Sequence, residues 1–404
     1  MDRPQSMERH RGAHAAHGSC AAPRAVVCGA GNIGRGFIGQ LFSESGYHVT
    51  FVDIDSGLVA RLNEAGGYTI RLVSDQGDET RWIHPVDAVD GRDGNAFAEA
   101  LRRADCLAVS VGLAALPHLA RPIAAGLRLR WSEQRPPLDI LICENGLEAP
   151  AVLSKAVMDQ LGDAEQVRLH REVGFVETCI GRMVPASGDD TADPLLVRAE
   201  PYAELPVARD AFRGLLPSIR GMVPYAPFDY PVRRKLYVHN MGHAVAAWLG
   251  HRAGCRFIWE AVGDESVRAV TRGAMLEAAE ALSMEYGVLP GELADHVDSL
   301  LERFANRRLG DTVERVGRDL VRKLSREDRL IGAMRLCLRH DIEPLHIAQG
   351  LEAALAFPDP ASDTVRRLLQ SQGPEGVLDA VCGFHPGEWQ REAVLKALRQ
   401  WVVV

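Results

Sequence analysis

The chain has 404 residues and a formal net charge of -8, with 47% hydrophobic and 25% charged residues. This length favours two globular domains, and the acidic balance argues against nucleic acid or an anionic membrane surface as partners. No stretch approaches the ~18 consecutive apolar residues that a membrane span needs, so we expect a cytoplasmic protein whose partner is a small molecule.

The first segment, residues 1–22, is polar, rich in His and Arg and without periodicity. It also lacks the apolar core of a secretory signal, so we predict a disordered tail. The eight cysteines of the chain are scattered and form no Cys-x-x-Cys pair. We therefore expect buried, reduced thiols rather than a zinc or redox site.

After this tail, short apolar runs alternate with helical stretches. The first such unit has the order strand, turn, helix, strand. Its segments are AVVCG, a glycine-rich turn, FIGQLFSES and HVTFVD. Further buried strands are expected at 106–111 and 138–143, with an amphipathic helix at 113–127 between them. The alternating polar stretch at 68–83 fits a small hairpin insertion. We predict an α/β fold in which residues 23–205 form a Rossmann-type domain with a doubly wound parallel sheet.

From about residue 206 the pattern becomes helical. Apolar residues recur three or four apart in the segments 242–254, 267–287 and 311–324. We predict an all-helical domain at 206–404 that carries the substrate and catalytic residues. The cleft between the two domains is the expected position of the active site.

The glycine-rich turn follows a predicted strand and opens a helix, which is the context that makes a G-x-G-x-x-G pattern informative. Its first glycine permits a tight turn, the second lets the backbone approach a pyrophosphate, and the third allows close packing of helix on strand. Asp53 lies 19 residues after the last of these glycines, at the end of the second strand. The expected cofactor-binding residues are Gly29, Gly31, Asn32, Ile33, Gly34 and Asp53.

The carboxylate of Asp53 favours NAD over NADP, because it accepts hydrogen bonds from ribose hydroxyls and repels a 2′-phosphate. Asp55 is an alternative for this role. Either carboxylate can instead cap the helix that is expected to begin near Ser56.

Candidate catalytic residues lie in the segment KLYVHNMGHA. Lys235, Asn240 and His243 are spaced i, i+5 and i+8 and fall within a ~140° arc of a single α-helix. A desolvated lysine can transfer the hydroxyl proton, an amide can stabilise the reacting oxygen, and a histidine can orient a neighbouring hydroxyl. The alternative for the lysine is a solvated face, since two arginines precede it. His239 has metal-pair spacing with His243, but no third ligand follows, so we expect no metal.

Five segments carry a resemblance to a known family: GAGNIGRGFIG, CEN, the VGF and RMVP pair, KLYVHNMGHA, and RFANRRLGDTVERVGRDLVRKLSREDRLIG. They resemble the mannitol-1-phosphate 5-dehydrogenases within the polyol-specific long-chain dehydrogenase/reductase, or mannitol dehydrogenase, family. The resemblance runs in order from about residue 24 to the C-terminus. It implies a metal-independent, NAD-dependent enzyme in which Lys235 is the acid/base, Asn145 and Asn240 polarise the reacting oxygen, and His243 contacts the substrate.

The implied reaction interconverts D-mannitol 1-phosphate and D-fructose 6-phosphate. Two positions depart from the family pattern: Gly181 stands where an aspartate is usual, and residues 231–234 lack a glutamate that relatives often place there. Basic residues crowd the segment from 307 to 323, and we take Arg35, Arg307 and Arg308 as phosphate candidates because arginine suits phosphate geometry. The alternative is a solvated helix face.

Other functions remain open at this point. One is a reductase of a free polyol, of a hexuronate, or of an unusual phosphorylated or phosphonate polyol. A different class of function is a non-catalytic NAD(H)-binding redox sensor. The lysine, asparagine and histidine of the candidate site argue against the sensor, which has no need for acid/base chemistry.

Overall fold

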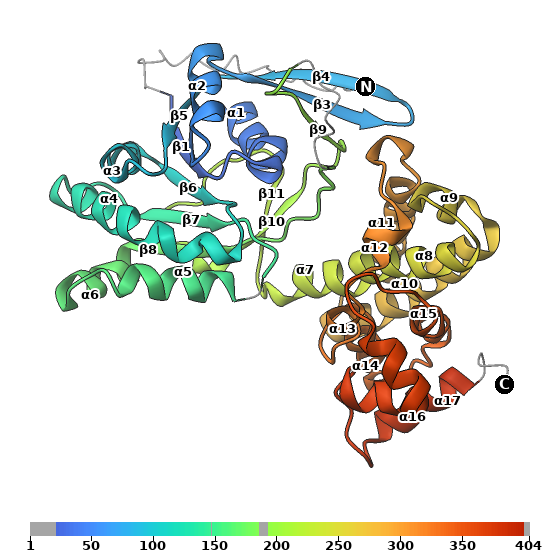
Figure 1. Cartoon of the computed structure of the whole chain (residues 1–404). Helices are drawn as coiled ribbons and strands as arrows, with labels where there is room; N and C mark the ends of the chain where they lie inside the picture. Colours follow the sequence, from blue (N-terminus) through green and yellow to red (C-terminus); the bar gives the residue numbers. More distant parts are fainter. Residues whose placement is uncertain (1–21, 147, 186–192, 400–404) are drawn as a thin grey trace, which may run out of the picture.

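The computed structural model describes residues 22–146, 148–185 and 193–399. The predicted tail therefore lies outside the described residues except for its last position. Figure 1 shows a sheet domain, coloured blue to green, beside a helical domain, coloured yellow to red, with helix α7 (Asp229–Arg234) at the junction. Both predicted architectures are confirmed. The exact boundary at residue 205 stays a prediction.

The main sheet of the first domain has six parallel strands in the order β5-β2-β1-β6-β7-β8. These are β1 (Arg24–Cys28), β2 (His48–Asp53), β5 (Val86–Asp90), β6 (Cys106–Val109), β7 (Leu138–Ile142) and β8 (Val173–Glu177). The order reverses between β1 and β6. In a doubly wound sheet this switch point opens a crevice at the carboxyl ends of the strands, where ligands bind.

Helices cover both faces of this sheet. They are η1 (Gly34–Gly39), α1 (Gln40–Glu44), α2 (Ser56–Ala65), α3 (Gly94–Arg103), η2 (Leu113–Leu119), α4 (Ala120–Ser132), α5 (Ala149–Met158) and α6 (Asp163–Glu172). Successive residues of β1 belong to opposite cores: Val27 packs with one cluster, and Val26 and Cys28 with the other. This alternation buries the strand on both faces, which is why its sequence is a continuous apolar run.

The predicted hairpin is confirmed by β3 (Tyr68–Ser74) and β4 (Gly77–Ile83), which pair antiparallel. The strand β9 (Val197–Ala199) joins β3 in parallel, while β10 (Leu205–Ala208) and β11 (Met222–Tyr225) form a separate pair, with η3 (Arg209–Ala211) after β10. The hairpin also contacts the helical domain, since Asn306 Nδ2 donates to Val73 O at 2.9 Å. It therefore helps to fix the two domains against each other.

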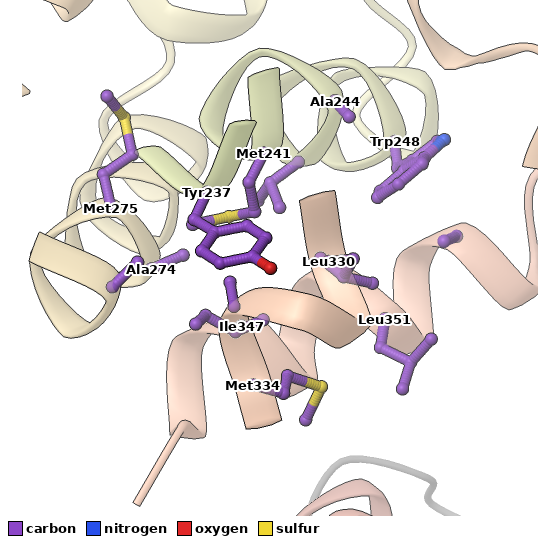
Figure 2. Packing of buried hydrophobic residues seen from close by; sticks show 14 of the residues in the cluster. Tyr237, Met241, Ala244, Trp248, Ala274, Met275, Leu330, Met334, Ile347 and Leu351 are labelled. Atoms are coloured by element: carbon purple, nitrogen blue, oxygen red, sulfur yellow. The ribbon is translucent and has the colours of Figure 1, made fainter. Parts of the chain in front are cut away.

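The second domain is helical. After α7 it contains η4 (Lys235–Asn240), α8 (Met241–Arg252), α9 (Ile258–Gly263), α10 (Glu265–Tyr286), α11 (Pro290–Phe304), η5 (Arg307–Leu309), α12 (Val313–Gly317), α13 (Leu320–Lys323), α14 (Arg329–Arg339), α15 (Leu345–Leu355), α16 (Thr364–Ala380) and α17 (Trp389–Arg399). Figure 2 shows Tyr237 and Met241 packed among side chains such as Met334 and Ile347 of the neighbouring helices. This packing anchors the inner face of η4 and α8.

One predicted helix is wrong. The segment 311–324 does not form a single helix but breaks into α12 and α13. At the break Asp319 adopts a left-handed φ of 72°, and the backbone N–H groups of Asp319 and Leu320 donate to the carboxylate of Asp359 at 3.0 and 2.7 Å. Trp248 Nε1 also donates to Gly317 O at 2.9 Å. These tertiary hydrogen bonds replace the helical ones that the periodicity predicts.

The cysteines within the described residues are all free, and all but Cys255 are buried, as expected. Cys20 lies outside that part of the chain. Among the described residues, no helix is long and apolar enough to cross a membrane.

A buried ion pair joins the two domains. Arg303 in α11 donates through Nε and Nη2 to both carboxylate oxygens of Glu200 at 2.7 and 2.6 Å, and Nη2 also donates to Gly181 O. The side chains of Glu200 and Arg303 are only 1% and 12% exposed. Loss of one partner would leave the other charge buried and uncompensated.

We therefore expect Glu200→Ala to destabilise the protein by about 3–5 kcal/mol. The matched control is Asp298→Ala, since Asp298 accepts the same two-point contact from Arg272 at a half-exposed position. Asp298→Ala is expected to lower the free energy of unfolding by ~1 kcal/mol or less. Urea unfolding of both variants checks the prediction, and equal urea midpoints for the two variants would contradict it.

Candidate active site

A cleft of about 780 Å³ lies between the two domains. Its walls come from the ends of β7 and β8, from the segment 180–185, from η4 and the start of α8, and from the segment 309–329. Four predicted catalytic residues line it, namely Asn145, Lys235, Asn240 and His243. Ile33 of the glycine turn reaches the same cleft.

Lys235 is the first residue of η4, and its Nζ donates to Asn145 Oδ1 at 2.6 Å. Desolvation lowers the pKa of Lys235 below its ordinary value; the nearby Cys179 opposes this shift, and the positive charge of Arg329 adds to it. A lowered pKa lets a lysine exchange a proton at lower pH than a solvated one. The contact also joins the domains, because Asn145 follows β7 and Lys235 belongs to the helical domain.

The turn that carries Lys235 and Asn240 is a π-helix, whereas the spacing predicts an ordinary α-helix. The N–H of Met241 donates to Leu236 O, five residues back. Because a π-helix, with its i to i+5 hydrogen bonds, has more residues per turn, residues five apart are less offset around its axis than in an α-helix. Lys235 and Asn240 therefore lie nearer to one face than the α-helical geometry predicts. Within the described residues the Asn240 amide has no hydrogen-bond partner, so it is available to a ligand.

His243 is held by two contacts. Its ring stacks on Phe304 with centroids 4.7 Å apart, and its Nε2 lies 3.4 Å from Asp311 Oδ2. Desolvation lowers the pKa of His243 to about 4, although Asp311 opposes the shift. The ring is therefore neutral at neutral pH and can orient a hydroxyl without adding charge. His239 is buried beside the same phenyl ring, 5.6 Å between centroids.

The three glycines of the turn differ in what surrounds them. A Cβ on Gly29, whose φ is 92°, would lie 2.4 Å from Ser110 O, and a Cβ on Gly34 would lie 1.8 Å from Gly29 O. A Cβ on Gly31 would meet nothing within 4 Å. The first and third glycines are thus required by the fold, while the second leaves open space over the turn. This space fits the approach of a dinucleotide pyrophosphate.

Asp53 and Asp55 have separate roles. Asp55 caps α2, since its Oδ1 accepts from the N–H groups of Gly57 and Leu58 at 2.9 and 3.0 Å. Asp53 is not a helix cap, and its Oδ2 accepts from Ala30 N in the glycine turn at 2.7 Å. Its carboxylate therefore lies beside the expected cofactor position. Asn32 donates through Nδ2 to Pro185 O at 3.4 Å.

Glu144 and Glu177 line the sheet side of the cleft and were not among the predicted site residues. Glu144 accepts from the N–H groups of Val111 and Gly112 at 2.7 and 2.8 Å and so fixes the loop after β6. Burial raises the pKa of Glu144 and of Glu177. Both residues lie at the carboxyl ends of buried strands, a position that is itself a signal for site residues in this type of sheet.

The three arginines predicted to contact phosphate lie outside the cleft. Arg35 is buried outside the cleft, where Nε donates to Ala30 O at 2.6 Å and Nη1 to Leu195 O at 2.8 Å. Arg307 stacks over Trp259 and Arg308 faces Asp78 of the hairpin, and both are exposed. None of these three arginines lines the cleft. The arginines that do so in the segment 309–329 are Arg315, Arg322 and Arg329.

The doubly wound sheet, the glycine turn and the lysine in the cleft define a nicotinamide-dependent alcohol dehydrogenase. Two family models match the chain: the mannitol dehydrogenase Rossmann domain at residues 23–221 and the mannitol dehydrogenase C-terminal domain at residues 228–373. The chain belongs to the mannitol dehydrogenase family.

Two bacterial relatives are 36% identical to the chain. One is the mannitol-1-phosphate 5-dehydrogenase of Brevibacillus brevis, aligned over 383 residues, 93% of this chain and 98% of that protein. The other is the enzyme of the same name from Bacillus licheniformis, aligned over 364 residues, 89% and 95%.

Solved structures agree on the fold. D-sorbitol dehydrogenase superposes with a TM-score of 0.76 at 16% identity, covering 94% of this chain and 93% of that one. Pseudomonas fluorescens mannitol 2-dehydrogenase, solved with NAD and D-mannitol, gives a TM-score of 0.71 at 18% identity, covering 94% and 91%.

Proposed function

We propose that this protein interconverts D-mannitol 1-phosphate and D-fructose 6-phosphate with NAD as the cofactor. The observation that carries the proposal is the Lys235–Asn145 contact of 2.6 Å across the cleft, which assembles acid/base and oxygen-binding groups from both domains. The names of the two 36% identical relatives support the substrate.

In the reductive direction the ketone oxygen would lie between Lys235 and the amides of Asn145 and Asn240. Asn145 Oδ1 accepts from Lys235, and its Nδ2, which has no acceptor within the described part of the chain, can donate to this oxygen. A bound nicotinamide would supply the hydride to the carbonyl carbon. The Lys235 ammonium then gives its proton to the oxygen, and the two amides stabilise the negative charge that develops there. In the oxidative direction the neutral amine takes the hydroxyl proton.

His243 has a supporting role in this proposal. Its neutral ring is positioned by Phe304 and Asp311, so it can hold a hydroxyl next to the reacting carbon. Placement of the substrate by such groups lowers the entropic part of the barrier.

Asp53 underlies the proposed preference for NAD. We expect Asp53→Asn to raise kcat/KM with NADPH by about 10-fold, the effect of removing ~1.4 kcal/mol of repulsion from a 2′-phosphate. The amide oxygen keeps an acceptor for Ala30 N, so the turn is retained. Asp55→Asn is the matched control, because that carboxylate caps α2. If the ratio of kcat/KM with NADPH to kcat/KM with NADH were unchanged in Asp53→Asn, the role of Asp53 in cofactor choice would be contradicted.

The experiment that tests the function is steady-state kinetics, followed by NADH absorbance, with fructose 6-phosphate, fructose and tagaturonate. Each substrate is assayed with NADH and with NADPH. The proposal expects the largest kcat/KM for fructose 6-phosphate with NADH. Greater activity on fructose or tagaturonate would replace it with a free-polyol or hexuronate reductase. Tight NADH binding without turnover of any polyol phosphate would indicate a redox sensor.

A further inference from the structure

Two arginines in the wall of the cleft share one carboxylate. Asp328 Oδ1 accepts from Arg329 Nε at 2.7 Å, and Asp328 Oδ2 accepts from Arg322 Nη1 at 3.3 Å. Arg322 Nε also donates to Asp319 at 2.6 Å. Ser325 lies between these two arginines in the sequence and lines the same cleft.

These partners leave several donors unused. Within the described residues, the two Nη atoms of Arg329 have no acceptor. The same is true of Nη2 of Arg322 and of the Ser325 hydroxyl. The side chain of Arg329 is only 13% exposed. Burial lowers the pKa of Arg329 in spite of Asp328, so this carboxylate does not fully compensate for the lost hydration. A second anion at Arg329 would be favourable.

The arginine pair lies within electrostatic reach of the reacting groups. The positive charge of Arg329 contributes to the lowered pKa of both Lys235 and His243. In fructose 6-phosphate the phosphate-bearing carbon is separated from the carbonyl carbon by three others. A substrate with its carbonyl oxygen at Lys235 can therefore extend its phosphate toward Arg329.

We propose that Arg322, Ser325 and Arg329 form the subsite that binds the phosphate group of the substrate. Guanidinium groups present paired N–H donors that match phosphate oxygens, and the serine hydroxyl adds a neutral donor. The subsite belongs to the helical domain, whereas the glycine turn offers a separate anion site on the sheet domain. This assignment rests on the proposed function.

The test compares Arg322→Met and Arg329→Met with a control, Arg318→Met. Arg318 lies four residues before Arg322, is exposed and does not line the cleft. We expect each cleft variant to lower kcat/KM for fructose 6-phosphate by about 10- to 100-fold, the effect of one charged hydrogen-bonding group. In both variants the loss of kcat/KM is expected to be larger for fructose 6-phosphate than for fructose, which carries no phosphate, and the KM for NADH is expected to be unchanged. The control variant is expected to match the unmodified protein.

Inorganic phosphate serves as a second probe. It is expected to inhibit the unmodified protein competitively with fructose 6-phosphate, and its inhibition constant is expected to rise about 10-fold or more in both variants. Because Arg322 is exposed, its variant keeps the test valid even if Arg329→Met fails to fold.

Two results would overturn the subsite. An equal loss of activity on fructose and fructose 6-phosphate would mean that the arginines act on the reaction and not on the phosphate. If the variants raised the KM for NADH and left the KM for fructose 6-phosphate unchanged, the two arginines would be assigned to the cofactor pyrophosphate. Failure of the proposed function is distinct, since the unmodified protein would then show no preference for fructose 6-phosphate.

Discussion

Replacing Lys235 with alanine is expected to lower kcat by about 10²- to 10⁴-fold, the contribution typical of a positioned acid/base group. NADH affinity is expected to be retained, because the lysine belongs to η4 and not to the glycine turn. Stopped-flow or steady-state NADH absorbance gives kcat, and fluorescence titration gives NADH affinity. Lys155→Ala is the control, since that lysine is exposed and, among the residues that the structure describes, pairs with Asp159 alone. Full activity of Lys235→Ala would remove the lysine from the mechanism.

The pH dependence follows from the same residue. Reduction needs the protonated lysine, so its rate is expected to fall as pH rises through the pKa of Lys235. Oxidation needs the neutral amine, so its rate is expected to rise over the same interval. Desolvation places this pKa below the ordinary 10.5. The fall in the reduction rate and the rise in the oxidation rate are therefore both expected below pH 10.5. Profiles in the two directions that do not mirror each other would contradict a single acid/base group.

Replacing Gly34 with alanine is expected to destabilise the protein by about 3 kcal/mol and to abolish NADH binding. The added Cβ would lie 1.8 Å from Gly29 O, which forces the turn backbone to shift. The matched variant is Gly31→Ala, where the Cβ meets nothing within 4 Å. We expect this protein to keep its stability within about 0.5 kcal/mol while its NADH affinity falls, because the methyl group enters the space over the turn.

Thermal unfolding and fluorescence titration of both variants separate the two roles. Equal loss of stability would show that the second glycine is also required by the packing. Normal NADH affinity in Gly31→Ala would mean that the pyrophosphate does not approach the backbone at this position.

The fold was largely predictable because its signals are local. The main strands are buried on both faces, so their sequences are continuous apolar runs, and the sequence of the hairpin alternates between apolar and polar residues. The glycine turn was predictable because its G-x-G-x-x-G pattern lies directly between a strand and a helix in the sequence. The helix predicted at 311–324 failed because its break depends on Asp359, forty residues beyond Asp319.

The candidate site was predictable in its central residues and not in its outer ones. The spacing of Lys235, Asn240 and His243 is visible in the sequence, and all three residues line the cleft. Arg35 was a poor phosphate candidate because its guanidinium is used by two backbone carbonyls, one of them 160 residues away at Leu195. A sequence gives the charge of an arginine but not the acceptors that already occupy it.

The sequence by itself determined the two-domain architecture, the glycine turn and the identity of the residues around Lys235, because periodicity, turn chemistry and short motifs act over a few residues. The tertiary structure alone decided that Lys235 donates directly to Asn145, 90 residues away, that η4 winds as a π-helix, and that Arg322 and Arg329 line the cleft. These features depend on which segments the folded chain brings together. They arise from long-range packing and desolvation, for which the local pattern carries no signal.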